Sequence, residues 1–363
     1  MQQEQRARPR GRRRGLRALA LAGVLAVTLT AALPARAAQA PAESGGGQTQ
    51  ARRVIPLGRA VGIKLFSDGV MVVGFSQVGE QEDQTSPARD CGLKEGDIIT
   101  HINSVEVDTI EQVQDVLQQA EGEPVSIRCL RGEDSLQVTA QAVRCGGDGQ
   151  YRLGAWIRDS MAGIGTLTYY DPDTGAFGAL GHGINDMDTA QLMPLQSGSI
   201  LYAQVTDVQK GESGKPGQLR GAFRAEQDMG ELWANTDSGV FGRLDDVDLA
   251  GGLPALEVAH RSQVKTGAAT ILSNIAGEQV EEYQVEITRI YPESAGDTRN
   301  LMIKVTDPRL LEATGGIVQG MSGSPILQDG RIVGAVTHVL VNDPTSGYGI
   351  LMENMLETAG EEV

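Results

Sequence analysis

Alternating apolar and polar residues dominate the second half of this 363-residue chain. Such alternation is typical of half-buried β-strands, whose side chains point to opposite faces in turn. Many short strands divided by glycine turns predict an all-β barrel or sandwich rather than a parallel α/β sheet. A helical pattern appears only near the end, at residues 352–359. The alternating runs lie at residues 164–169, 200–205, 269–275, 283–290 and 301–305.

Residues 54–145 combine strand-like runs with one amphipathic helix. Residues 61–65 and 70–73 have strand patterns, and residues 125–130 and 136–143 have two more. Asp108 as N-cap and Glu111 three places later form the pattern of a capping box, which predicts the start of a helix. This helix would have one apolar face, made by Ile110, Val113 and Leu117.

This segment resembles a PDZ domain of the kind found in bacterial secreted proteases. PDZ domains bind an extended peptide as an added strand between a sheet edge and a helix. The resemblance therefore implies a groove between residues 61–65 and 110–117, unless the helix only packs on a small barrel with an unused groove. The predicted peptide-binding residues are Gly58, Gly62, Ile63 and Val113. The residues that carry the resemblance are the small-residue turn at 86–92, the run at 93–99, the pair at 102–103 and the helix.

The first 53 residues have the layout of an export signal followed by a linker. Seven arginines lie between residues 6 and 17, an apolar stretch follows at 18–33, and small residues at 35–40 provide Ala-x-Ala cleavage signals. The apolar stretch is shorter than the about 20 residues of a usual spanning helix. Cleavage and retention as a membrane anchor both remain open. The predicted organisation is an export segment and linker at 1–53, a PDZ domain at 54–145 and a second, mainly β domain at 150–363.

The net charge of −16 conceals a basic N-terminus and an acidic body. Residues 1–53 hold ten of the 31 basic residues and two of the 47 acidic ones, so the remainder carries 21 basic and 45 acidic side chains. Proteins that bind nucleic acid concentrate positive charge to contact phosphates. The acidic body therefore excludes nucleic acid as a partner.

Three cysteines, Cys91, Cys129 and Cys145, make an odd number, so at least one thiol lacks a partner within the chain. A Cys129–Cys145 bridge and three free thiols are both compatible with the sequence. The absence of a Cys-x-x-Cys spacing removes the common redox and structural-zinc motifs. The sequence implies no metal and no cofactor.

The hexapeptide Gly320-Met321-Ser322-Gly323-Ser324-Pro325 has the composition of a tight turn that exposes a serine nucleophile. Gly320 and Gly323 allow backbone angles that other residues resist. Small neighbours also let a substrate carbonyl approach the backbone amides that would stabilise an oxyanion. An ordinary glycine- and serine-rich hairpin has the same composition, so other residues must decide between the two interpretations.

His182 is the best candidate for a general base among the four histidines. Glycines flank it on both sides, so its imidazole is accessible to other segments. His338 lies 16 residues after Ser322, in a strand-like run, and is expected to line a pocket. His101 is expected to be structural and His260 to lie on a solvated face.

The order of these residues favours the chymotrypsin arrangement. A serine hydrolase of α/β type needs the order Ser, Asp, His, whereas His182 lies well before Ser322. The order His, Asp, Ser in an all-β body fits the chymotrypsin-like barrel. Asp307, at the end of the strand-like run 301–305, is the candidate third member. Its rivals are Asp186, Asp188, Asp245 and Asp246.

Four segments closely resemble the stage IV sporulation protein B (SpoIVB) family of serine peptidases. The resemblance implies that residues 150–363 are a serine peptidase domain with a catalytic His, Asp and Ser, which fall on His182, Asp307 and Ser322. The spacing Gly-x-Ser-Gly-x-Pro favours Ser322 over Ser324 as nucleophile, with the amides of Gly320 and Ser322 as the oxyanion hole. The matching segments are residues 181–183, 314–325, 334–338 and 341–349.

The resemblance also implies a signalling endopeptidase of endospore formation. Such a protein is exported into the space between the two forespore membranes. There it cleaves itself and a regulatory membrane protein, which triggers intramembrane processing of a late sigma-factor precursor. Its partners would be peptides and proteins, and its N-terminal segment would contact the membrane. The alternative is a PDZ-based tethering protein in which peptidase activity is vestigial.

Overall fold

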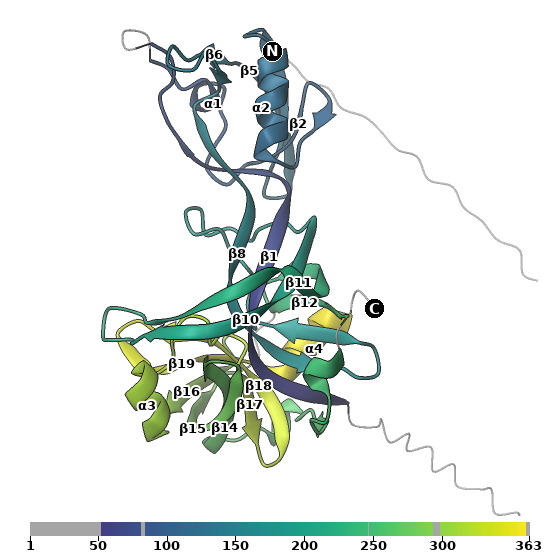
Figure 1. Cartoon of the computed structure of the whole chain (residues 1–363), viewed down its shortest axis with the longest axis vertical. Helices are drawn as coiled ribbons and strands as arrows, with labels where there is room; N and C mark the ends of the chain where they lie inside the picture. The colour runs from purple at the N-terminus through teal and green to yellow at the C-terminus, as the bar shows by residue number, and fades with distance from the viewer. Residues whose placement is uncertain (1–51, 81–83, 246, 293–297, 361–363) are drawn as a thin grey trace, which may run out of the picture. The chain divides into compact units, whose positions relative to one another are not determined.

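The computed structural model describes residues 52–80, 84–245, 247–292 and 298–360. The predicted export segment, and all but the last two residues of the predicted linker, lie outside these residues. None of the helices in the described part of the chain is long and apolar enough to cross a membrane. The described residues form mainly β-structure, as the alternating patterns predict (Figure 1).

Six strands close into a first barrel. Each strand pairs with the next, and β10 pairs with β1 to complete the ring. Apolar residues such as Ile63, Leu167 and Phe177 fill its core. The strands, in the order of pairing, are β1 (Arg53–Phe75), β8 (Ala155–Tyr170), β9 (Ala176–Ala179), β12 (Gly239–Leu244), β11 (Gln218–Thr236) and β10 (Ser197–Gln209).

Six further strands close into a second barrel. Along β15, Tyr283, Val285 and Ile287 are buried while the residues between them are exposed, so the two-residue period of the sequence matches the inward and outward faces. Their side chains join one apolar core. The ring consists of β14 (Gly267–Ala276), β15 (Gln279–Ile290), β16 (Leu301–Val305), β19 (Asp343–Leu351), β18 (Arg331–Leu340) and β17 (Pro325–Gln328).

The PDZ part has its own core around α2. Val113 and Leu117 of the helix pack with Val72, Ile99 and Ile127. Its elements are α1 (Pro87–Asp90), β2 (Ile98–Ile102), β3 (Val105–Glu106), α2 (Ile110–Gln119), β4 (Pro124–Arg131) and β5 (Asp134–Gln141), followed by the short pair β6 (Val143–Arg144) and β7 (Tyr151–Arg152).

Helix α2 begins one residue later than the sequence predicts. Thr109 is the N-cap, and its hydroxyl and the Gln112 side chain form the reciprocal capping box. Asp108 instead accepts a hydrogen bond from the Gly69 amide at 3.1 Å. Ile110 is 39% exposed, so the buried face of the helix is narrower than predicted.

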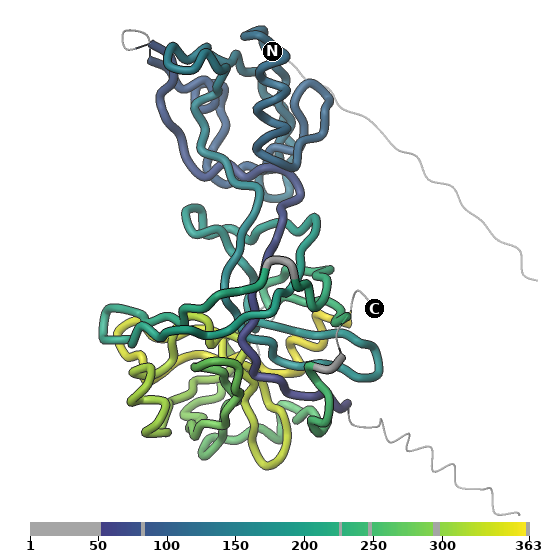
Figure 2. Tube along the Cα trace, in the orientation of Figure 1, coloured from purple at the N-terminus to yellow at the C-terminus, as the bar shows by residue number. Residues whose placement is uncertain are grey.

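The long strand β1 contributes to both parts of the chain. Residues 61–66 pair with β8 on one side and β10 on the other, within the first barrel. Residues 70–71 pair with β2 of the PDZ part. Figure 2 shows the traces of β1 and β8 running side by side. The PDZ part is therefore an insertion between two paired barrel strands, and residues 54–66 belong to the first barrel.

The remaining elements are short. The C-terminal helix α4 (Met352–Gly360) confirms the predicted helix and buries Met352, Met355, Leu356 and Ala359. Helix α3 (Pro308–Thr314), which follows β16, is not predicted by the alternating pattern. The other elements are β13 (Leu256–Glu257) and the 3₁₀ turns η1 (Val247–Ala250) and η2 (Arg261–Gln263). All three cysteines are free, and Cys129 is buried in the PDZ core.

Candidate active site

Ser322 lies on a tight turn immediately before β17. Gly320 and Gly323 have φ angles of 98° and 97°, in the left-handed region that favours glycine. A Cβ atom on Gly323 would lie 2.1 Å from the carbonyl oxygen of Thr166. The turn therefore depends on glycine at this position. The Ser322 hydroxyl donates a hydrogen bond to the Thr337 carbonyl at 2.6 Å.

Two amides of this turn are free to bind an oxyanion. The amides of Gln319, Met321, Gly323 and Ser324 each donate a backbone hydrogen bond. Those of Gly320 and Ser322 donate none to any described residue. Two unpaired amides, one of the nucleophile itself and one two residues before it, are the feature that an oxyanion hole requires. This geometry supports the predicted role of Gly320 and Ser322.

Ser324 points away from this position. It is fully buried, and its hydroxyl bonds to that of Ser273 in β14 at 3.2 Å. Ser322 is partly exposed. The structure therefore favours Ser322 over Ser324 as the accessible nucleophile.

His182 follows β9 after two successive residues with left-handed backbone. Leu180 has φ of 67° and Gly181 of 68°. A non-glycine residue in this region costs about 1–3 kcal/mol and is a recurrent feature of functional sites. The turn aims the imidazole Nδ1 at the Gly183 carbonyl oxygen, 2.8 Å away. Because a carbonyl oxygen only accepts, Nδ1 carries the proton and Nε2 is the basic nitrogen.

Thr166 of β8 connects the serine turn to the histidine turn. Its amide donates to the Ser322 carbonyl at 3.1 Å, and its carbonyl accepts from the Leu180 amide at 3.2 Å. Its hydroxyl also donates to the Gly320 carbonyl at 2.7 Å. The fold thus brings His182 and Ser322 to the same site from two different barrels.

His338 lies against the candidate base. Its ring centroid is 4.9 Å from that of His182, with 37° between the ring planes. Burial lowers the pKa of His338 to about 4, helped by the nearby His182 and Arg299. Burial also lowers the pKa of His182, against the opposing effect of its bond to Gly183. Both imidazoles are therefore neutral at pH 7, as a general base must be.

The structure does not bring Asp307 together with His182. Asp307 is the N-cap of α3, and its carboxylate binds the Arg309 guanidinium at 2.9 and 3.1 Å. It also accepts from the amides of Gln284 and Arg309. The Arg309 guanidinium lowers the pKa of Asp307 to about 2, with help from these amides and against the opposing effect of burial. None of the contacts of this carboxylate involves His182 or Ser322.

The rival carboxylates nearest in sequence also have other partners. Asp186 is buried, pairs with Arg158 and accepts from the amides of Asp188 and Thr189. Asp188 also binds Arg158, at 2.8 Å. These acids stabilise the loop that follows His182 rather than the imidazole itself.

Asn235 is a residue that sequence reasoning missed. It is the penultimate residue of strand β11, just before the turn at 237–238, and its side chain makes three hydrogen bonds to the loop after His182. The only signal in the sequence is the turn-like run 235–239, which is typical of a hairpin. The contact itself spans 51 residues in sequence and could not be read from the local pattern.

Three of the predicted peptide-binding residues of the PDZ domain lie in the first barrel, which corrects the prediction. Gly62 and Ile63 are paired with both β8 and β10, so their strand has no open edge for a peptide. A Cβ atom on Gly58 would lie 2.6 Å from Leu272 Cβ of the second barrel. Val113 belongs to the PDZ part, where it is buried in the core.

The open strand edge beside α2 belongs to β8. Across residues 155–158, β8 pairs with β1 on one edge and with no described strand on the other. The Ile110 amide at the start of α2 donates to the Asp159 carboxylate at 2.9 Å, which places the helix along this strand. Trp156, on the same strand, is 63% exposed. A sheet edge beside a helix is the arrangement by which PDZ domains take a peptide.

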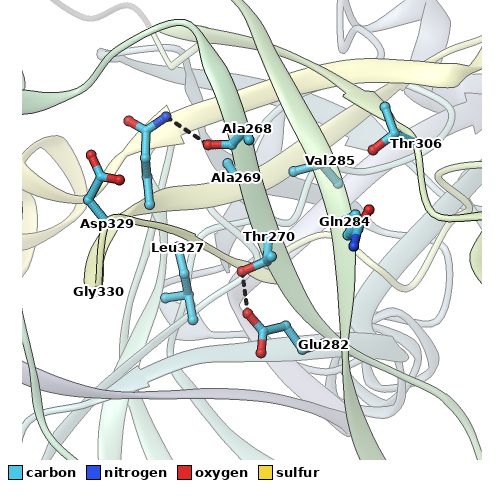
Figure 3. Close-up of a pocket in the computed structure, with 11 residues that line it drawn as sticks. Ala268, Ala269, Thr270, Glu282, Gln284, Val285, Thr306, Leu327, Asp329 and Gly330 are labelled. Atoms are coloured by element: carbon cyan, nitrogen blue, oxygen red, sulfur yellow. Dashed lines mark hydrogen bonds between the residues drawn. The ribbon is translucent and has the colours of Figure 1, made fainter.

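One pocket lies apart from the candidate catalytic residues, and a second adjoins them. A pocket of about 510 Å³ lies in the second barrel, where Thr270 donates to Glu282 at 2.6 Å (Figure 3). It contains none of the candidate catalytic residues. A smaller apolar pocket of about 110 Å³ is lined by Ile63, Leu180 and Ile184 among others. The last two residues flank His182, so this pocket adjoins the candidate base.

Two six-stranded barrels that bring a histidine to a serine on a glycine turn define a serine peptidase of the chymotrypsin-like fold. Comparison with family models agrees with this class. The SpoIVB peptidase S55 model matches residues 149–356, and a PDZ-domain model matches residues 80–131. The chain therefore belongs to the SpoIVB peptidase S55 family, and carries a PDZ domain before the peptidase.

Similar proteins cover smaller parts of the chain or resemble it distantly. The zinc metalloprotease RasP of Shouchella clausii (strain KSM-K16) is 40% identical over 57 residues, and the chain spans only 14% of its length. The active form of the Rv3671c protease from M. tuberculosis is 15% identical with a TM-score of 0.32, covering 68% of this chain and 84% of that one. The HtrA-type protease AlgW with decapeptide is 13% identical with a TM-score of 0.33, covering 60% of this chain and 55% of that one.

Proposed function

We propose that this serine peptidase is the signalling endopeptidase of endospore formation, with Ser322 as nucleophile and His182 as general base. It would cleave itself and a regulatory membrane protein, and so trigger intramembrane processing of a late sigma-factor precursor. The family membership of residues 149–356 supports this role. Export into the space between the forespore membranes, with membrane contact through the N-terminal segment, is part of the same proposal.

The observation that carries the catalytic assignment is the convergence of three groups on one turn. Thr166 bonds both to the serine turn and to Leu180, two residues before His182, and the amides of Gly320 and of Ser322 itself are unpaired among the described residues. In the reaction the Ser322 hydroxyl leaves the Thr337 carbonyl and gives its proton to His182 Nε2. The hydroxyl oxygen attacks the peptide carbonyl, whose oxygen is stabilised by the amides of Gly320 and Ser322.

Self-cleavage of the full chain tests this assignment. The wild type, Ser322→Ala and Ser324→Ala are purified and followed over time by gel electrophoresis and mass spectrometry. We expect fragments from the wild type and the Ser324→Ala variant and none from Ser322→Ala. N-terminal sequencing of the fragments identifies the cleavage site. Equal fragmentation of Ser322→Ala and the wild type would assign cleavage to another protein and remove Ser322 from the proposal.

We also propose that the PDZ part captures peptides at the open edge of β8, which would serve tethering as well as cleavage. The supporting observation is the exposed Trp156 on that edge beside α2. Full-length Ser322→Ala protein is titrated with a ten-residue peptide ending in a free carboxylate, and with its amidated form. We expect a change in tryptophan fluorescence that is lost in a Trp156→Phe variant. An unchanged signal, together with no binding by calorimetry, would contradict peptide capture at β8.

A further inference from the structure

The hydrogen bond that orients His182 ends on a peptide group that a side chain holds in turn. The Gly183 carbonyl accepts from His182 Nδ1 at 2.8 Å. The same peptide group ends in the Ile184 amide, which donates to Asn235 Oδ1 at 2.8 Å. One peptide plane therefore lies between the imidazole and the Asn235 side chain.

The amide of Asn235 is fixed in its orientation. Its Nδ2 donates to the carbonyls of Ile184 at 3.0 Å and of Met193 at 2.8 Å. Since carbonyl oxygens cannot donate, only this orientation satisfies all three bonds. Asn235 thus fixes both ends of the Ile184 residue and the far end of the loop at Met193. Asn235 is partly buried, so water competes only weakly for these hydrogen bonds.

We propose that Asn235 is a positioning residue for the general base. Through the Gly183–Ile184 peptide it holds the His182 imidazole with Nδ1 protonated and Nε2 free to take the proton of Ser322. In a Ser-His-Asp triad a carboxylate performs this task. In this structure the Gly183 carbonyl accepts the hydrogen bond from Nδ1, and Asn235 fixes and polarises that carbonyl, because hydrogen bonds in a chain strengthen one another.

The contacts of Asp307 agree with this assignment. Its carboxylate is fully engaged by Arg309 and two backbone amides in the second barrel. The 183–184 peptide is instead held by a residue of the first barrel, the barrel that carries His182. The proposal deepens the proposed function, since it rests on His182 being the base for Ser322.

The test measures how fast a fluorophosphonate probe labels Ser322, which requires no knowledge of the natural substrate. Wild type, Asn235→Ala, Asn274→Ala and His182→Gln proteins are compared over a range of pH. Asn274 is a matched control because its side-chain amide also makes three hydrogen bonds to the backbone, in this case all to carbonyls, those of Ala276, Gly277 and Gln279, at a turn of the second barrel.

We expect Asn235→Ala to label about 10- to 100-fold more slowly, as for a base displaced by up to about 1 Å. The pH at which its labelling rate falls off on the acid side should be lower, because the bond to Gly183 raises the pKa of His182 and weakening that bond lowers it. Asn274→Ala should lower the melting temperature without altering either quantity. A wild-type rate and pH profile in Asn235→Ala would overturn the proposal. Wild-type labelling of His182→Gln would instead remove the base assignment itself.

A second measurement applies even where Asn235→Ala does not fold. Ser322→Ala protein labelled with ¹⁵N-histidine reports the tautomer of each ring, and the His182→Gln change assigns the His182 signals. We expect a protonated Nδ1 with a slowly exchanging, hydrogen-bonded proton. A protonated Nε2 at pH 7, or rapid exchange of the Nδ1 proton, would overturn the proposal.

Discussion

The Ser322 hydroxyl donates to the Thr337 carbonyl at 2.6 Å, and the next residue of that strand, His338, lies against His182. Strand β18 therefore contacts both the nucleophile and the base. In this arrangement the serine hydroxyl is not directed at His182. Attack requires rotation about the Ser322 side-chain bond, from Thr337 towards Nε2, so binding of a substrate must favour the second position.

The serine turn should not tolerate any side chain at position 323. Gly323→Ala places a Cβ 2.1 Å from the Thr166 carbonyl and strains a φ of 97°. We expect labelling of Ser322 to fall by at least about 100-fold, because the turn must move relative to His182. Gly330→Ala is the control: its φ is 76° but nothing lies within 4 Å of the new Cβ. Comparable rates in the two variants would contradict this account of the turn.

His338 should act through its ring rather than its charge. His338→Phe keeps an aromatic ring against His182 and removes the buried Nδ1, which has no hydrogen-bond partner among the described residues. An unsatisfied buried polar atom costs about 1–3 kcal/mol. Because the ring against His182 is kept, we expect His338→Phe to be labelled at Ser322 at a rate within about threefold of the wild type. Because the unsatisfied atom is removed, we expect an unchanged or higher melting temperature. His338→Ala, which removes the ring, should label more slowly. Equal rates for Phe and Ala would show that the ring contact is dispensable.

Stability should fall as the pH drops from about 6.5 to about 4. The pKa of His338 is about 4 in the folded protein, whereas in the unfolded chain, where the ring is not buried, it has the ordinary value of 6.5. Between these values the unfolded chain binds the proton and the folded chain does not, so acid favours unfolding. At 1.36 kcal/mol per pKa unit, the difference between these two pKa values sets an upper limit of about 3.4 kcal/mol for His338, which solvent screening of its partly exposed ring reduces. Urea unfolding of Ser322→Ala across this pH range, with and without His338→Phe, measures the contribution of His338 to the free energy of unfolding. An equal decline in both proteins would assign the loss to other groups.

The barrels could be predicted from the sequence, whereas the long-range contacts could not. Alternation along residues 283–290 is local, and the buried and exposed positions match it. The extent of β1 is not local: residues 61–66 have the pattern of any strand, and only pairing with β10 assigns them to a barrel. The serine turn and His182 could be identified from their flanking glycines. Asn235 could not, because its partners lie 42 to 51 residues away.

Substitution of Asp307 separates a structural role from a catalytic one. As the N-cap of α3 and the partner of Arg309, Asp307 should contribute about 1 kcal/mol through its cap alone. A triad aspartate would matter far more to the chemistry, since its replacement by asparagine costs about 10⁴-fold in rate. From the contacts of its carboxylate, we expect Asp307→Asn and Arg309→Ala to lower the melting temperature similarly and to slow labelling of Ser322 less than about tenfold. A loss near 10⁴-fold in Asp307→Asn alone, with Arg309→Ala active, would instead restore Asp307 as the acid that orients His182.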